Sequence, residues 1–216
     1  MFNVMDVLNV TGIFPILAYA ETDSAVPAAR AMVDGGLPVL EVLMRDEHAM
    51  QNLKNILREV PELMAGAGTI LTVDQAKQAI DIGAKFIVMP GFSEKIVRLC
   101  VDNNVLVVPG CVTATELMAA NEYGLELIKF FPIYEMGGAA TIDMLSGPFP
   151  SMRFMVTGNL HGDNFLPLLQ CSHIIAAGGD WMFQEHDALK NKDYDQISRN
   201  LRNSILRVQN MRNTRV

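Results

Sequence analysis

The sequence is short of positive charge. Its 216 residues include 17 Lys and Arg against 24 Asp and Glu, which gives a formal net charge of −7 at pH 7. Proteins that bind nucleic acid depend on Lys and Arg to neutralise phosphates, so this balance argues against a nucleic-acid partner. A small anionic substrate is still compatible with it, because one local cluster of cations can outweigh the overall charge.

Cysteine and metal-binding histidine patterns are also scarce. The three cysteines, Cys100, Cys111 and Cys171, show no CxxC spacing and stand beside apolar residues. That usage is typical of reduced, buried thiols in a cytosolic protein. No histidine pairs convincingly with a cysteine as a catalytic partner, and neither HxH nor HExxH spacing occurs. We therefore expect neither a catalytic thiol nor a metal site.

No apolar run reaches the roughly 18–20 residues that cross a bilayer. The longest candidate, from Gly12 to Ala20, contains Pro15 and is followed by Glu21. The N-terminus lacks the positively charged start of a secretory signal. Hydrophobic residues nevertheless make up 50% of the chain, which is enough for a large core. We expect a soluble cytoplasmic protein with no membrane partner.

Short apolar runs alternate with amphipathic segments from one end of the chain to the other, and recur about every 20 to 26 residues. The runs are Ile13–Ala18, Val39–Met44, Leu63–Ala67, Lys85–Met89, Val105–Val108, Leu125–Phe131, Arg153–Val156 and His173–Ala177. Continuous apolar strands between helices indicate a parallel sheet covered by helices. Eight such units predict a single (β/α)8 barrel domain over residues 1–216. An open doubly wound sheet is the main alternative, since strand count alone does not close a barrel.

Several helix boundaries can be read from capping residues. Thr22 or Asp23 is expected to cap the helix after the first strand, and Thr72 and Thr113 to cap two later ones. A final helix is predicted at about 193–212, because apolar residues recur there every three or four positions along one face.

Charged residues interrupt two of the apolar runs, and a charge inside a barrel is costly unless it is paired or used. Side chains alternate along a strand, so Glu41 and Arg45 lie on one face, with Arg45 nearer the C-terminal end. Lys129 stands in the sixth run, whose opposite face is fully apolar. We expect all three side chains to point into the barrel, toward the end where catalytic groups of this fold gather.

A lysine, a carboxylate and an arginine together suit chemistry on 2-keto acids. A lysine held among apolar groups beside another cation loses part of its preference for the charged form, as an amine nucleophile toward a ketone requires. A nearby carboxylate can move protons, and an arginine can bind a substrate carboxylate through two hydrogen bonds. The alternative is a buried ion-pair network that only fixes strand register.

Five short segments occur in order along the chain. They are Val39-Leu40-Glu41-Val42 with Arg45, Gly66-Ala67-Gly68-Thr69, Pro90-Gly91, Val108-Pro109-Gly110 and Lys129-Phe130-Phe131-Pro132. Each is weak alone. In this order and spacing, over nearly the whole chain from Ile13 to about Tyr194, the sequence resembles the 2-keto-3-deoxy-6-phosphogluconate (KDPG) / 4-hydroxy-2-oxoglutarate (KHG) aldolase family.

The resemblance implies a homotrimer and a class I aldolase, a lyase that cleaves a 2-keto-3-deoxy sugar acid or 4-hydroxy-2-oxoglutarate to pyruvate and an aldehyde. It implies no metal and no cofactor. By position, Lys129 would form the Schiff base and Glu41 would act as general acid and base. The implied substrate-binding residues are Arg45 and Thr69 for the pyruvate carboxylate, with Pro90 and Phe131 as walls of the pocket.

The sequence departs from the family in the two loops where this fold often binds a phosphate. The family has Thr-Gly-Gly after strand seven and Gly-Gly-Ser after strand eight; this chain has Thr157-Gly158-Asn159 and Gly178-Gly179-Asp180. Asn can adopt the left-handed conformation that Gly permits. A carboxylate about 4–5 Å from a phosphate would cost roughly 3–4 kcal/mol per unit charge at an effective dielectric near 20. Asp180 is better suited to accept hydrogen bonds from sugar hydroxyls. We therefore expect that the natural substrate lacks a terminal phosphate, or that the protein binds this phosphate poorly. The alternative is that Asp180 only caps the next helix.

Three other functions compete with this interpretation. A sugar-acid-binding protein could keep the pocket without turnover, although the complete set of Lys129, Glu41 and Arg45 argues against it. A phosphate-binding barrel isomerase would need a phosphate site where Asp180 stands. A dinucleotide site is a poor fit to Gly66-x-Gly68, because the third glycine is missing and the motif does not follow a first strand.

Overall fold

The computed structural model describes residues 3–214, within which eight parallel strands form one sheet in the order β5-β4-β3-β2-β1-β8-β7-β6. The strands are β1 (Ile13–Leu17), β2 (Val39–Leu43), β3 (Met64–Gly68), β4 (Phe86–Val88), β5 (Leu106–Val108), β6 (Leu127–Phe130), β7 (Arg153–Thr157) and β8 (Ile174–Gly179). A bridge between Gly110 and Lys129 joins the two edges. There the Lys129 N–H donates to the Pro109 carbonyl at 2.9 Å, and the Cys111 N–H donates to the Lys129 carbonyl at 3.0 Å. The sheet is therefore a barrel, and the open-sheet alternative is wrong.

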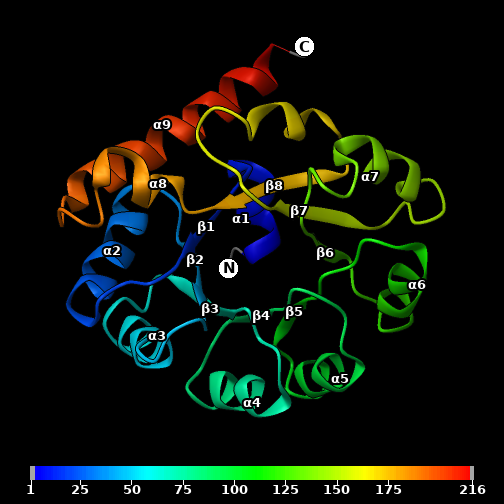
Figure 1. The fold of residues 1–216 in the computed structure, drawn as a ribbon, viewed down its shortest axis with the longest axis horizontal. Coiled ribbons are helices and arrows are strands. Elements are labelled where there is room, and N and C mark those ends of the chain that lie inside the picture. Colours follow the sequence, from blue (N-terminus) through cyan, green and yellow to red (C-terminus); the bar gives the residue numbers. More distant parts are fainter. Residues whose placement is uncertain (1–2, 215–216) are drawn as a thin grey trace.

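Helices surround the barrel (Figure 1). They are α1 (Val4–Thr11), α2 (Thr22–Asp34), α3 (Ala49–Glu59), α4 (Val73–Asp81), α5 (Glu94–Asp102), α6 (Ala114–Glu122), α7 (Gly138–Ser146), η1 (Leu166–Gln170), α8 (Trp181–Gln184), η2 (Glu185–Asp187) and α9 (Tyr194–Asn213). Most form the outer ring. Helix α1 instead shows through the centre of the ring in Figure 1, since it lies at the N-terminal end of the barrel beside the starts of β2, β3 and β5.

Burial explains why the strands are mostly apolar. Every residue of β1, β2, β4 and β6 is buried, because side chains facing inward meet across the barrel and side chains facing outward meet the helices. Helix α9 packs against α2, where the Ser198 hydroxyl donates to the Ala31 carbonyl at 2.9 Å. Helix α9 also fixes the indole of Trp181 just after β8, through a 3.0 Å hydrogen bond to Ser204. Helix α9 therefore fixes the position of the loop that follows β8.

Most expected element boundaries are confirmed to within a few residues, and the final helix predicted at about 193–212 is α9. Thr72 and Thr113 cap α4 and α6, each in a capping box with the residue three positions on. Expectation failed at α2, which begins one residue earlier than a Thr22 or Asp23 cap would allow. Its N-cap is Glu21, without a side-chain hydrogen bond.

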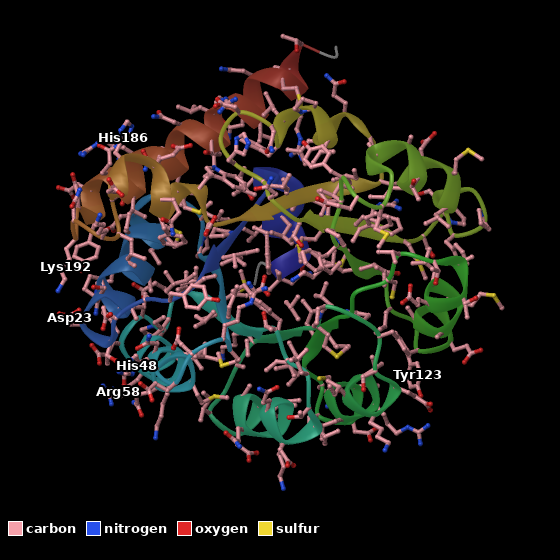
Figure 2. The ribbon with its side chains drawn as sticks, viewed as in Figure 1. Asp23, His48, Arg58, Tyr123, His186 and Lys192 are labelled. Atoms are coloured by element: carbon pink, nitrogen blue, oxygen red, sulfur yellow. The ribbon has the colours of Figure 1, made fainter. Side chains whose placement is uncertain are left out.

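The structure gives a reason for the misplaced cap of α2. The Asp23 carboxylate accepts a 2.6 Å hydrogen bond from Lys192, which lies just before α9, and Figure 2 shows the two side chains together at the edge of the molecule. A partner 169 positions away cannot be recognised from local sequence. Helix α1 was also unpredicted; Asn3 and Asp6 form its capping box. None of the described helices combines the length and apolarity that a membrane crossing requires.

Candidate active site

A cavity of about 260 Å³ opens at the C-terminal ends of the strands. Residues from most of the strand ends line it. They are Ile16, Ala18, Tyr19, Leu43, Arg45, Thr69, Pro90, Lys129, Phe131, Thr157, Gly158, Asn159, Leu160, Gly178, Gly179 and Asp180. The structure therefore brings together every site residue expected from the sequence except Glu41, which lies behind the cavity wall.

Lys129 and Glu41 form an ion pair inside the barrel. The Lys129 Nζ lies 3.7 Å from the Glu41 Oε1, and the two residues are 5% and 0% exposed. Lys129 lines the cavity, whereas the fully buried Glu41 does not. The ring of Phe131 covers the amine, with its centroid 5.8 Å from Nζ. The arrangement presents one amine to the cavity and keeps a carboxylate directly behind it.

The Glu41 carboxylate is an unusual buried group. Neither of its oxygens has a hydrogen-bond partner among the described residues. Burial raises the pKa of this carboxyl above its ordinary value, while the positive charges of Lys129 and Arg45 act in the opposite direction. It fits here only because residue 68 is glycine: a Cβ on Gly68 would lie 1.9 Å from Oε1. A carboxyl with a raised pKa keeps its proton to a higher pH than an ordinary glutamate, which suits a group that must both donate and accept protons.

Arg45 and Thr69 meet at the cavity wall. Arg45 lies just beyond β2 and Thr69 just beyond β3, and the Arg45 Nε donates a 3.0 Å hydrogen bond to the Thr69 Oγ1. Thr69 has a left-handed backbone with φ of 55°, which turns the chain sharply at the end of the strand. The pair offers a guanidinium in a fixed orientation, which suits a carboxylate.

The opposite side of the cavity is formed by the ends of β7, β8 and β1. Thr157, Gly158 and Asn159 end β7, and Gly178, Gly179 and Asp180 end β8. The Thr157 hydroxyl is buried without a hydrogen-bond partner among the described residues. Asp180 takes the N-cap position of α8, but its side chain makes no capping hydrogen bond. Asp180 therefore stands both at the start of α8 and in the lining of the cavity.

Comparison with known proteins agrees with this geometry. The family model for KDPG and KHG aldolase matches residues 4–200. The chain belongs to this family. It is 35% identical to the KHG/KDPG aldolase of Escherichia coli K12 over 199 residues, covering 92% of this chain and 93% of that one. It is 34% identical to the 2-dehydro-3-deoxy-phosphogluconate aldolase of Treponema pallidum over 198 residues, covering 92% and 94%.

Solved structures of KDPG aldolases share the fold. The Legionella pneumophila enzyme, with pyruvate captured at low pH as a covalent carbinolamine intermediate, matches with a TM-score of 0.87 and 28% identity, over 94% of this chain and 98% of that one. The enzyme of Zymomonas mobilis ZM4, with 3-phosphoglycerate, matches with a TM-score of 0.84 and 30% identity, over 93% and 94%.

Five lining residues of this family member were not expected from its sequence: Ile16, Ala18, Tyr19, Leu43 and Leu160. Four are apolar, and they follow the rule that strand ends face the mouth of the barrel. Tyr19 is different, because it is exposed and has a left-handed backbone with φ of 53°. A bulky residue with positive φ is a signal of a functional turn, but sequence does not reveal it.

None of the histidines or cysteines, all of which lie among the described residues, lines the cavity. His48 and His186 are exposed at the edge of the molecule (Figure 2), as expected. Burial raises the pKa of the Cys100 thiol to about 11 and that of Cys111 to about 12, so neither forms a thiolate at neutral pH. The described residues contain no grouping of His, Cys, Asp and Glu side chains arranged to hold a metal ion.

Proposed function

We propose that this protein is a class I aldolase that reversibly cleaves a 2-keto-3-deoxy sugar acid or 4-hydroxy-2-oxoglutarate to pyruvate and an aldehyde. One observation carries the proposal: the Lys129 amine opens into the cavity, with the Glu41 carboxylate 3.7 Å from it, and the hydrogen-bonded Arg45–Thr69 pair lines the same cavity. The names of the relatives and the covalent pyruvate intermediate in the Legionella structure support it.

In the proposed mechanism, Arg45 and Thr69 hold the substrate carboxylate so that its C2 carbonyl meets Lys129. The amine adds to C2 to give a carbinolamine, and Glu41 supplies the proton with which water leaves to form an iminium ion. The Glu41 carboxylate, which has given up its proton, then accepts the proton of the C4 hydroxyl; the C3–C4 bond breaks, and its electrons pass to the iminium nitrogen. The aldehyde departs, Glu41 returns the proton to C3 of the enamine, and water releases pyruvate and the free amine.

Pro90 and Phe131 are assigned to the walls that position the keto acid. Both line the cavity, and the Phe131 ring lies over the amine. An aromatic ring at this position excludes water from the imine carbon and keeps the amine oriented toward the substrate.

Borohydride trapping tests the proposal. The protein is incubated with pyruvate, reduced and digested, and the modified peptide is located by mass spectrometry. We expect one pyruvate-derived adduct, on Lys129; no adduct, or one on another lysine, contradicts the assignment. Steady-state cleavage assays on the same preparation separate an aldolase from a binding protein, because a non-catalytic pocket would show no turnover.

We also propose that the chain forms a homotrimer, as the family resemblance implies. Support comes from large apolar side chains left exposed near α7, namely Tyr134 at 44%, Met136 at 43% and Met144 at 78%. Exposed apolar clusters of this kind mark protein contacts. Sedimentation equilibrium of the wild type and of Met144→Asp measures the assembly, and a monomeric wild type contradicts the proposal. A cytoplasmic location is proposed with it, supported by the three free cysteines.

A further inference from the structure

The charges that line the cavity are divided between its two sides. Arg45 and Lys129 are the cations, and both belong to the side assigned to the pyruvate carbons. On the opposite side, formed by the ends of β7, β8 and β1, the described lining residues include no Lys, Arg or His. The charged side chain there is Asp180. An anionic group on the substrate would therefore find a cation on one side and a carboxylate on the other.

Asp180 is available to a ligand. Its backbone carbonyl accepts the N–H groups of Phe183 and Gln184, which begin α8. Its carboxylate, in contrast, makes no hydrogen bond or ion pair with any described residue, although the residue is partly buried at the cavity wall. A carboxylate in such a place is an acceptor of hydrogen bonds and donates none, so hydroxyl groups are its natural partners.

Thr157 gives a second, independent indication. The residue is 3% exposed and lines the cavity, and its Oγ1 has no partner among the described residues. It pairs with Gly178 across β7 and β8, two positions before Asp180. A buried hydroxyl without a partner is destabilising, and a ligand in the cavity that this residue lines can supply the missing hydrogen bond. The Thr157 hydroxyl can both donate and accept a hydrogen bond, and so can a hydroxyl group of a ligand, so the two groups are complementary.

The glycines on this side are explained by packing. A Cβ on Gly179 would lie 2.5 Å from the Trp181 ring, and a Cβ on Gly178 would lie 2.7 Å from the Thr157 Cγ2. Their small size is therefore required by neighbouring side chains, and it is no evidence that the backbone comes close to a phosphate. With no cation beside them and Asp180 next in sequence, these loops present an acceptor where an anion would need donors.

We infer that the side of the cavity formed by Thr157 and Asp180 binds an uncharged, hydroxylated chain. This inference rests on the proposed aldolase function and narrows it to 2-keto-3-deoxy sugar acids whose far end carries free hydroxyl groups. A terminal phosphate or a second carboxylate at that end is rejected by Asp180. Thr157 and Asp180 are thus specificity-determining residues for the aldehyde half of the substrate.

Three substrates test the inference: 2-keto-3-deoxygluconate, its 6-phosphate and 4-hydroxy-2-oxoglutarate. For the wild type, we expect kcat/KM to be highest for 2-keto-3-deoxygluconate, whose far end is uncharged, by about 100-fold over each of the other two, as repulsion from one nearby carboxylate allows. Asp180→Ser should narrow the gap to the 6-phosphate by at least about tenfold, chiefly through a gain on the phosphorylated substrate. Asp163→Asn is the matched control, since it removes one exposed negative charge from the loop after β7, outside the cavity.

The outcomes separate the inference from the function on which it rests. Preference of the wild type for the phosphate or for the dicarboxylate overturns the inference, and so does an Asp180→Ser variant with an unchanged ratio. A shift as large in Asp163→Asn also overturns it, because bulk charge would then explain the effect. Borohydride trapping of pyruvate on Lys129 is measured in parallel. If the Lys129 adduct forms but the enzyme prefers the phosphate or the dicarboxylate, the inference fails and the aldolase function stands. If neither the adduct nor turnover is found, the function and the inference are both rejected.

Discussion

The pyruvate side and the far side of the cavity differ in whether their polar side chains contact one another. On the pyruvate side, Lys129 pairs with Glu41 and Arg45 bonds to Thr69, so these groups hold one another in place before any ligand arrives. On the far side, the Thr157 hydroxyl and the Asp180 carboxylate have no partners among the described residues. One side is organised in advance, and the other is completed by what it binds.

This difference follows from the work that each side must do. Covalent chemistry needs groups fixed to within a fraction of an ångström, and mutual contacts provide that. Selection of one substrate from several needs polar groups that are left unsatisfied when the wrong substrate binds. The comparison leads us to expect that substitutions on the pyruvate side reduce the rate for every substrate. Substitutions on the far side should change the ranking of substrates.

Removal of the amine should have the largest effect and tests the pyruvate side most directly. Lys129→Met keeps the length of the side chain, and Glu41 can take up a proton when its partner is lost. We expect kcat/KM to fall by roughly 10⁴–10⁶-fold, the range seen when a covalent nucleophile is removed. Cleavage of each of the three keto acids is the measurement. Equal losses of kcat/KM on all three keto acids support the assignment of catalysis to the pyruvate side. A loss confined to one keto acid contradicts it.

Glu41→Gln should cause the next largest loss of kcat/KM. General acid–base residues contribute about 10²–10⁴-fold, so a loss in that range is expected on all substrates. Because burial raises the pKa of Glu41, the carboxyl takes up its proton at a higher pH than an ordinary glutamate. The acid limb of wild-type kcat/KM should accordingly lie above the usual glutamate range, and it should vanish in the variant. Exposed Glu122→Gln serves as the control; if Glu41→Gln keeps the limb, another group is responsible.

Arg45→Ala should have a smaller effect, concentrated in KM. A hydrogen bond to a charged group is worth about 1.5–3 kcal/mol, so KM for the keto acid should rise roughly 10- to 100-fold while kcat changes less. Arg58→Ala is the matched control, because Arg58 pairs with Glu59 on α3 at the edge of the molecule (Figure 2). A KM increase that appeared only for the phosphorylated substrate would show that Arg45 binds the phosphate. Arg45 would then belong to the far side of the cavity and not to the pyruvate side.

Sequence revealed the pyruvate side better than the far side, and the reason is physical. Glu41 and Lys129 are charged residues in otherwise apolar strands. Because side chains alternate along a strand, their positions place both side chains inside the barrel. Thr69 was found only through the family, since a Thr after Gly-Ala-Gly looks like any helix start. Its contact with Arg45 depends on a left-handed turn that local sequence does not specify.

The same reasoning explains what could be predicted of the fold. Apolar runs and capping residues are local signals, so the eight strands and the caps at Thr72 and Thr113 could be located. The start of α2 and the orientation of Tyr19 could not, because they depend on contacts and turns set by the assembled barrel. On the far side, sequence located Asp180 but could not tell whether its carboxylate serves the helix or the cavity. The structure places Asp180 at the N-cap of α8 without a side-chain capping hydrogen bond, and also in the lining of the cavity.

Thr157→Val should have the smallest effect and tests the far side through stability as well as specificity. The substitution keeps the branched shape and removes a buried hydroxyl that has no partner, so the free energy of unfolding should rise by about 1 kcal/mol. The same change in Thr11 should lower it, since that hydroxyl donates to the Val7 carbonyl at 2.8 Å. Urea denaturation of both variants measures the contrast. Thr157→Val should also raise KM for the hydroxylated sugar acid while leaving borohydride trapping of pyruvate intact. A destabilised Thr157→Val protein with unchanged KM would show that the hydroxyl is satisfied within the fold. The far side would then be as fully organised in advance as the pyruvate side.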